Sequence, residues 1–599
     1  MIKAIKRGRC TLALSVVLAS AAVCANGIPD DVGMRVELAG NDVYRVSVQV
    51  PSGPGSERQV KPVAGSNTVL RIDPDTGDIC IYAGADSAAS ILWQGRVRPL
   101  AGYGRMQGAG PEVEWDAQAE ERIYGLGEQF NRLDLRGRKV HMWVSDDFAQ
   151  GEGQTYYCTP VLYSSANYAL FAADNPEGDF ELAPRGDGRH HYRRAGSKAD
   201  FYLAFEPTLK SLALERGRLQ GPMRSIPDWA WGPWISRSSY PDQAAAEAVI
   251  GEMVRRDLPV AAIVQEAWKG PVETGQYNQY DPGRWPDLDR YFKLCTEHDI
   301  KTILWQVPII HPRSPEYAEA AAKGFFVKRP DGSVSPRLDW LPDFAHVDFS
   351  NPEAAAWWKD WLRPLVRMGV YGFKADDGEA IRPDDVFFNG LTGVDMHNQY
   401  TVLNGRTLTE LFDEEGVPGL LWSRAASLGS ERYPALWAGD QCATWGHYRS
   451  LVAAGLSASL SGMPFWGHDI GGYSDNPTPE LYVRWLQFGA FSPLMQYHGM
   501  KSREPWEFGP AAEAAYKLFA HLRMNLRPTW MALGRETAAT GLPIMRPMAM
   551  EFPDDPRFAD EDSQYMLGPD ILVAPVFEEG ALWRRVKFPA GTWHHLLQP

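Results

Sequence analysis

From residue 227 onward the sequence alternates short apolar runs with helix-like segments, and this alternation most constrains the fold. The apolar runs have strand length, and they number eight: 234–237, 260–265, 302–306, 369–376, 420–423, 436–440, 463–466 and 494–497. Amphipathic helical segments lie between several of them: 243–256, 288–298, 352–368, 399–415 and 448–456. Such alternation indicates parallel strands with helical crossovers. Eight strand candidates favour a (β/α)8 TIM barrel over an open sheet.

The segments on either side of this region have a different pattern. Residues 26–225 contain short strand-like runs punctuated by Gly, Pro, Asn and Asp, which predicts an N-terminal β-sandwich. The barrel is predicted over 226–536, and short strands resume over 537–599. We expect 537–599 to be the start of a C-terminal β-domain that is incomplete. The chain is therefore predicted to be multidomain.

Residues 1–25 resemble a secretory signal peptide. Four basic residues precede an apolar run over 12–23, which is too short to span a bilayer stably. No later apolar run is long enough to cross a membrane. We therefore expect an exported protein, either periplasmic or secreted, without a membrane span.

The charge and the cysteines exclude two classes of function. The formal net charge is −15, and removing the basic leader makes it more negative, which argues against nucleic acid as a partner. Cys80, Cys158, Cys295 and Cys442 are widely spaced and form no C-x-x-C pair, so we expect no metal site. No cofactor is predicted, and a homo-oligomer is left open.

The strand over 369–376 runs into a cluster of acidic residues. Side chains alternate along a strand, so Lys374 and Asp376 point to one side and Phe373 to the other. Carboxylates at the carboxyl end of a barrel strand indicate catalysis. A second acid, Asp440, ends the run 436–440. Two such carboxylates in a chain with 22 Trp predict acid and nucleophile chemistry on a sugar.

Four segments of the chain resemble glycoside hydrolase family 31, the α-glucosidase and α-xylosidase family. They are 373–379 (FKADDGE), 422–427 (WSRAAS), 465–472 (FWGHDIGG) and 541–547 (GLPIMRP). The resemblance extends from about residue 124 to 597. The Lys374 form of the first segment, together with 550–556 (MEFPDDP), is most similar to the α-xylosidase branch.

The resemblance implies a role for individual residues. Asp376 matches the family's nucleophile and Asp440 its general acid/base. The sugar-binding positions match Arg424, His468 and Asp469, and Trp305 matches an aromatic at the base of the site. The resemblance also implies retention of the anomeric configuration and action from the non-reducing end.

Elementary electrostatics agrees with these roles. Lys374 shares a strand face with Asp376 and is expected to keep it ionised. Asp440 follows Trp437 with few cations nearby in sequence, so desolvation is expected to raise its pKa, as a general acid requires. Arg424 can bind a carboxylate or sugar hydroxyls through its planar fork.

Several positions depart from the family pattern. Gln265 stands where an Asp is common, and Glu266 replaces a small or apolar residue; we assign both to the far side of the bound sugar. Asp377 stands where an apolar residue is common and is a rival for the nucleophile role, although strand parity favours Asp376. Gln496 replaces a common Arg.

Structural explanations compete with some of these assignments. His468 alone fits a hydrogen-bonded core histidine, Arg424 a structural ion-pair partner, and Trp305 ordinary barrel core. Asp395 and His397 suggest a metal ligand pair, but they lack a third ligand at useful spacing.

The sequence therefore predicts an exo-acting retaining α-glycosidase, with an oligosaccharide or glycoside as its partner. An α-xyloside or an α-galactoside is favoured over an α-glucoside; the galactoside case rests on Gln265 and Glu266. One alternative is a transglycosylase or lyase using the same covalent intermediate. The other is a carbohydrate-binding protein that has lost catalysis.

Overall fold

The computed structural model describes residues 33–597 except for 41–42, 50–67, 74–77, 84–89, 104–107, 147–154, 185, 187, 197, 271–277, 339–340 and 434. The predicted leader, 1–25, lies outside the described residues. Among the helices that are described, none combines the length and apolar character needed to cross a membrane. Cys158, Cys295 and Cys442 are free thiols.

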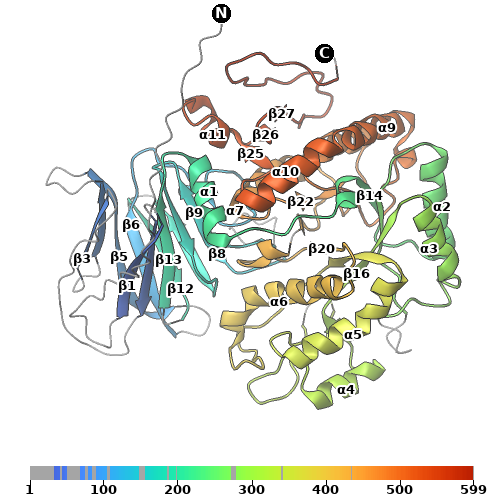
Figure 1. Ribbon diagram of the computed structural model, residues 1–599, viewed down its shortest axis with the longest axis horizontal. Coiled ribbons are helices and arrows are strands. Elements are labelled where there is room, and N and C mark those ends of the chain that lie inside the picture. The colour runs from blue at the N-terminus through green and yellow to red at the C-terminus, as the bar shows by residue number, and fades with distance from the viewer. Residues whose placement is uncertain are drawn as a thin grey trace, which may run out of the picture.

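The N-terminal region is a sandwich of two antiparallel sheets (Figure 1). One sheet has the order β1-β2-β13-β10-β9-β7, and the other β3-β4-β5-β6-β12-β11-β8. The first seven strands are β1 (Gly33–Gly40), β2 (Val43–Gln49), β3 (Thr68–Asp73), β4 (Asp78–Ala83), β5 (Ser90–Tyr103), β6 (Gly108–Asp116) and β7 (Ile123–Gly125). The remaining strands are β8 (Lys139–Met142), β9 (Val161–Ser164), β10 (Tyr168–Ala172), β11 (Gly178–Leu182), β12 (Arg189–Arg194) and β13 (Lys198–Phe205). Helix α1 (Leu209–Gln220) then leads to the barrel.

The central region is a parallel barrel. Its strands are β14 (Pro233–Ser236), β15 (Ala262–Gln265), β16 (Lys301–Gln306), β19 (Val370–Ala375), β20 (Leu420–Ser423), β21 (Leu436–Trp437), β22 (Trp466–Gly467), β23 (Asp469–Ile470) and β24 (Met495–Tyr497). β22 pairs with β21, and β23 pairs with β24. Only His468 separates β22 from β23, so the two are halves of one strand position that closes the ring at eight positions. The prediction of a (β/α)8 barrel is confirmed.

Helices surround the barrel (Figure 1). They are α2 (Gln243–Arg255), α3 (Leu288–Glu297), α4 (Pro315–Lys323), α5 (Pro352–Met368), α6 (Gly393–Glu414), α7 (Trp445–Ser461) and α8 (Pro479–Gly489). The segment 314–349 has none of the strand-like or helical runs expected from the sequence, but it contains α4 and β18 (Ala345–His346). β18 pairs with β17 (Ile309–Ile310) as a small antiparallel ribbon. Ser314 directly before Pro315 and Gly324 in the left-handed conformation are the start and stop signals of α4.

Strand register decides which side chains face the barrel interior. Lys374 of β19 is level with Trp305 of β16 and Trp422 of β20. One residue earlier Phe373 is level with Leu304, which in turn is level with Gln265 of β15. Since alternate residues face opposite sides, these two rows point in opposite directions. Phe373 packs against Phe412 of α6, so its row points outward.

A Gly-rich loop joins the sandwich to the barrel. Leu126 and Gly127 have positive φ, and the loop lies against α7, where Ser457 donates to the carbonyl of Gly127. A Cβ at Gly127 would meet the backbone of Tyr157, so the close approach requires glycine. Glu128, which follows, accepts a hydrogen bond from the Trp466 indole of β22. This loop therefore serves domain packing.

The chain continues past the barrel in α9 (Pro510–Asn525) and α10 (Arg527–Thr540), which cross its outside (Figure 1). The antiparallel sheet β25 (Met545–Pro547), β26 (Tyr565–Leu567) and β27 (Ile571–Val573) follows, with α11 (Met548–Glu551) beside it. Single-turn 3-10 helices occur at Asp228–Trp231, Ser430–Arg432, Pro505–Phe508 and Pro556–Phe558.

Candidate active site

Asp376 lies where β19 ends, at the carboxyl end of the barrel. Its Oδ2 accepts a hydrogen bond from the indole of Trp305 at 2.8 Å. Its Oδ1 lies 2.9 Å from Nε of Arg424 and accepts the backbone N–H of Asp377 at 2.9 Å. Both oxygens are thus held in place by a cation or by N–H donors. The side chain remains 15% exposed, so a substrate atom can reach it.

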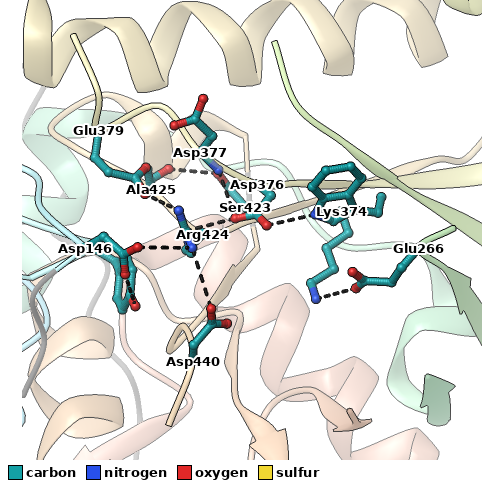
Figure 2. Close-up of polar contacts among 12 residues, drawn as sticks. Asp146, Glu266, Lys374, Asp376, Asp377, Glu379, Ser423, Arg424, Ala425 and Asp440 are labelled. Carbon is teal, nitrogen blue, oxygen red and sulfur yellow. Dashed lines mark hydrogen bonds and ion pairs between the residues drawn. The ribbon is translucent and has the colours of Figure 1, made fainter. Parts of the chain in front are cut away.

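Arg424 lies at the centre of a group of carboxylates (Figure 2). Its Nε faces Asp376, its Nη2 pairs with Glu379, and its Nη1 lies 3.7 Å from Asp146 and 3.8 Å from Asp440. Its guanidinium also lies over the ring of a tyrosine, Tyr156. A buried cation with this many anions is a charge anchor for the whole site, and its planar fork suits several carboxylates at once.

Asp440 follows β21 after a tight turn. Gly439 has φ +74, and a Cβ there would overlap the Tyr156 ring at 2.0 Å. Burial raises the pKa of Asp440 to about 7, and the charge of Asp376 adds to this while Arg424 opposes it. The side chain nevertheless keeps 32% of its surface exposed. Asp440 is thus a partly exposed carboxylic acid that holds its proton below about pH 7.

Lys374 belongs to a polar group deeper in the barrel. Its ammonium pairs with Glu266 at 2.7 Å and donates to Nε2 of His498 at 3.1 Å. It also lies 4.7 Å from the ring centroid of Trp437. Burial alone would lower the pKa of Lys374, but the nearby carboxylates, led by Glu266, raise it above its usual value. The direct charge on Asp376 therefore comes from Arg424, and Lys374 adds its charge from further away.

His498 is neutral in this group. Burial and the Lys374 charge lower the pKa of His498 well below its usual range. Since Nε2 accepts from Lys374, Nδ1 carries the proton and donates to the Ser236 hydroxyl at 2.8 Å. Asp469 also lies in the barrel interior, where its Oδ1 accepts from the Gln496 amide. Burial raises the pKa of Asp469 to about 8, opposed by Lys374.

Two predicted site residues do not face the site. Gln265 donates to the Tyr291 hydroxyl of α3, because it belongs to the outward row of β15. The next residue, Glu266, is the one that points inward. His468 lies between the barrel and α8, where its Nδ1 accepts the Trp485 indole and its ring stacks on Phe488. His468 is therefore a hydrogen-bonded core histidine, the alternative to a sugar-binding role that the sequence left open.

Asp377, the rival nucleophile, points away from Asp376. Its carboxylate is buried against Arg337 and His346, and its backbone is in the left-handed region at φ +70. Arg337 is among the causes that hold the pKa of Asp377 well below its ordinary value despite burial, which acts in the opposite direction. The parity argument for Asp376 over Asp377 thus agrees with the geometry.

Sequence reasoning missed Asp146, Glu379 and His498 as site residues. Asp146 comes from the N-terminal region, and no local signal connects it to the barrel; its Oδ1 accepts the Tyr156 hydroxyl. Glu379 stood inside the family-like segment 373–379 without an assigned role. His498 could have been found from parity, because Gln496 and His498 are two residues apart on one strand face.

Of the two side chains that suggested a metal ligand pair, Asp395 and His397, the histidine is otherwise engaged. Both ring nitrogens of His397 contact backbone carbonyls, those of Ile381 and Val144. In the described part of the chain, Glu112, Glu114 and His191 bring ligand atoms within 4.8 Å of one another. Arginines already pair with both of these carboxylates, Arg193 with Glu112 and Arg189 with Glu114. We assign no metal to either group.

Comparison with known protein families identifies three domains in the chain. The glycosyl hydrolases family 31 TIM-barrel domain matches residues 223–533. The family 31 N-terminal galactose mutarotase-like domain matches 62–180, and the family 31 C-terminal domain matches 541–599. The chain belongs to glycoside hydrolase family 31.

Individual relatives agree with this assignment. The chain is 32% identical over 490 residues to the α-xylosidase XylQ of Lactiplantibacillus pentosus, which covers 80% of this chain and 64% of that protein. It is 30% identical to a 1,3-α-isomaltosidase of Kribbella flavida, with 82% of this chain and 77% of the relative covered. A GH31 dextranase structure from Flavobacterium johnsoniae, at 25% identity, superposes with a TM-score of 0.83 and covers 92% of this chain and 73% of that one. The chain thus spans less than two thirds of the α-xylosidase.

Proposed function

We propose that this chain is a retaining, exo-acting α-glycosidase that removes a terminal non-reducing sugar. The observation that carries the proposal is the pair of unlike carboxyls on either side of Arg424. Asp376 is held by a cation and two N–H donors, whereas Asp440 has a pKa raised to about 7. A retaining mechanism requires one carboxyl held in position for attack and a second that carries a proton, and these two fit those roles.

The proposed reaction has two displacements. An oxygen of Asp376 bonds to the anomeric carbon as the glycosidic C–O bond breaks, and Asp440 gives its proton to the departing oxygen. Asp440, now a carboxylate, takes a proton from water as that water bonds to the anomeric carbon and releases Asp376. Two inversions at one carbon return the original anomeric configuration.

The burial of the residues around Lys374 supports action on a terminal sugar. The floor of the site is formed by four side chains in contact, Lys374, Glu266, His498 and Trp437. Of these, Trp437 and His498 are fully buried. A sugar chain that continued past the reacting sugar would have to pass through this floor. The floor also offers the Lys374–Glu266 ion pair to the hydroxyls of the bound sugar.

An α-xyloside is our first candidate substrate, on the similarity to an α-xylosidase and on the Lys374 form of segment 373–379. The α-galactoside candidate relied on Gln265 together with Glu266. Since Gln265 faces α3, that candidate keeps Glu266 alone, and it ranks below the xyloside.

The test is turnover of 4-nitrophenyl α-xyloside, α-galactoside and α-glucoside by the purified chain. We expect release from the xyloside and its loss, by about 10³-fold or more, in Asp376→Asn. Gln265→Ala is the matched control: its side chain faces α3, so activity per folded molecule should stay near wild type. Turnover that survives in Asp376→Asn would refute the nucleophile role, and binding of xylose without turnover would favour a lectin-like protein.

A further inference from the structure

The backbone after Asp376 adopts a conformation that its sequence does not favour by itself. Asp377 has φ +70 and Gly378 has φ +118, so two successive residues lie at positive φ. Glycine enters this region freely, whereas Asp enters it less readily, although more often than most other residues. Contacts that fix Asp377 would therefore stabilise this conformation.

The side chain of Asp377 makes such contacts. It is 2% exposed, and its Oδ2 accepts from Nη1 of Arg337 and from Nε2 of His346, the latter at 3.2 Å. Arg337 and His346 are themselves 2% and 4% exposed. A carboxylate with two buried partners has little freedom to rotate, and its backbone is fixed with it.

The two partners are also held in place. His346 belongs to β18, which pairs with β17, and its ring meets Tyr400 of α6 edge-on. The backbone N–H of Arg337 donates to the carbonyl of Phe344, which closes the loop before β18. One anchor on the ribbon, His346, and one in the chain before it, Arg337, thus reach a residue that follows β19.

Fixing Asp377 sets the direction of its N–H. That N–H donates to Oδ1 of Asp376 at 2.9 Å, the oxygen that also faces Nε of Arg424. A rotation of the peptide plane between residues 376 and 377, through ψ of Asp376 and φ of Asp377 together, would turn this donor away. Only the Trp305 indole on Oδ2 and the Arg424 cation would then orient the carboxylate.

We propose that Asp377, Arg337 and His346 form a positioning cluster that aims the Asp377 N–H at Asp376 and so holds the nucleophile in its attacking orientation. The proposal rests on the proposed function, because it presumes that Asp376 is the nucleophile. It gives a role to the second Asp of the Asp376-Asp377 pair: Asp377 does not touch the sugar and acts through its neighbour.

The experiment compares Asp377→Ala with Asp377→Asn on the α-glycoside that wild type cleaves. Each variant is also treated with the 5-fluoroglycosyl fluoride of the same sugar, and the rate at which the peptide containing Asp376 is labelled is measured by mass. We expect Asp377→Ala to lower both kcat and the labelling rate by about 10- to 100-fold, with KM within about threefold of wild type. Asp377→Asn should retain more of both rates, since Asn tolerates positive φ and keeps an acceptor for Arg337.

A second pair tests the anchor without touching the chain near Asp376. His346→Gln keeps a side-chain N–H donor, whereas His346→Phe removes it, and only the second should lower the labelling rate. Arg546→Gln is the control for a lost buried ion pair: Arg546 is 1% exposed and pairs with Glu536 and Glu551, remote from the site in sequence. Its kcat, counted per labelled molecule, should match wild type.

The outcomes separate the two claims. If Asp376→Asn still turns over, the nucleophile assignment fails and the positioning role fails with it. If Asp376→Asn is inactive but Asp377→Ala and His346→Phe label at the wild-type rate, the positioning role alone is overturned. A raised KM with unchanged kcat in Asp377→Ala would also overturn it, because that pattern reports lost binding.

Discussion

At the scale of the residue, the account depends on Asp440 holding a proton. Burial raises the pKa of Asp440 to about 7, so its protonated form predominates below that pH and is lost above it. We predict that kcat/KM falls as pH rises through about 7. Asp440→Asn should remove this alkaline limb for an activated aryl glycoside. An alkaline limb that persists unchanged in the variant would assign the limb to another group.

The face of a strand on which each side chain lies was predictable wherever the alternation of side chains was used. Lys374 and Asp376 were placed on one face because side chains alternate, and the structure has them so. The same rule applied to β15 would have put Gln265 outside and Glu266 inside, but family likeness was followed there instead. His468 and His498 show the same lesson, since alternation along the strand puts His468 outward between Gly467 and the inward Asp469, whereas His498 occupies the interior.

At the scale of the element, the turn after β21 sets the position of Asp440. Gly439 has φ +74, and a Cβ there would lie 2.0 Å from the Tyr156 ring. We predict that Gly439→Ala lowers kcat at least about tenfold, because Tyr156 or Asp440 must move. Steady-state kinetics measures kcat, and circular dichroism checks that the variant is folded.

Gly580→Ala is the matched control for that variant. Gly580 has φ +72, and a Cβ there has no atom within 4 Å, so it carries the same backbone strain without the overlap. Its kcat should equal that of wild type. Equal kcat losses in the two variants would mean that backbone strain, and not the Tyr156 contact, explains the effect.

The order of elements was predictable, and the insertions were not. Strands and helices of the barrel repeat a hydrophobic period that the sequence shows directly. The segment 314–349 has no such repeat, yet it contains α4 and also β18, which pairs with β17 just before the segment. The partners of Asp377 come from this segment, so the cluster around Asp377 could not be foreseen from local pattern.

At the scale of the whole molecule, the sandwich and the barrel share buried polar contacts. Burial raises the pKa of Glu128 to about 8, and the hydrogen bond from Trp466 opposes this only in part. Between the ordinary Glu value and about pH 8 the folded chain keeps a proton that the unfolded chain releases, so this group lowers stability as pH rises across that window. The variant Glu128→Gln has no carboxyl group at this position, so its stability lacks this dependence on pH.

We therefore predict that Glu128→Gln gains in melting temperature relative to wild type from pH 5 to pH 8, by about 1 to 3 °C. Differential scanning calorimetry of both proteins at pH 5 and at pH 8 measures this difference in melting temperature. Glu579→Gln, at an exposed position, is the control and should show no such trend. A constant difference for Glu128→Gln at both pH values would contradict the buried protonated state.

Asp146 shows why the complete site was beyond the sequence. It belongs to the N-terminal region, and it meets Arg424 only after the sandwich packs on the barrel. Two carboxylates on barrel strands can be found from strand ends and spacing, because one repeating unit places them all at one rim. A residue contributed by another domain has no such rule.

The most direct test of the central claim is the anomeric form of the first product. Proton NMR during cleavage of an α-xyloside distinguishes the α- from the β-sugar before the two interconvert. The proposed double displacement by Asp376 predicts that the α-anomer appears first and then mutarotates. Initial release of the β-anomer would show a single displacement by water and would contradict Asp376 as nucleophile.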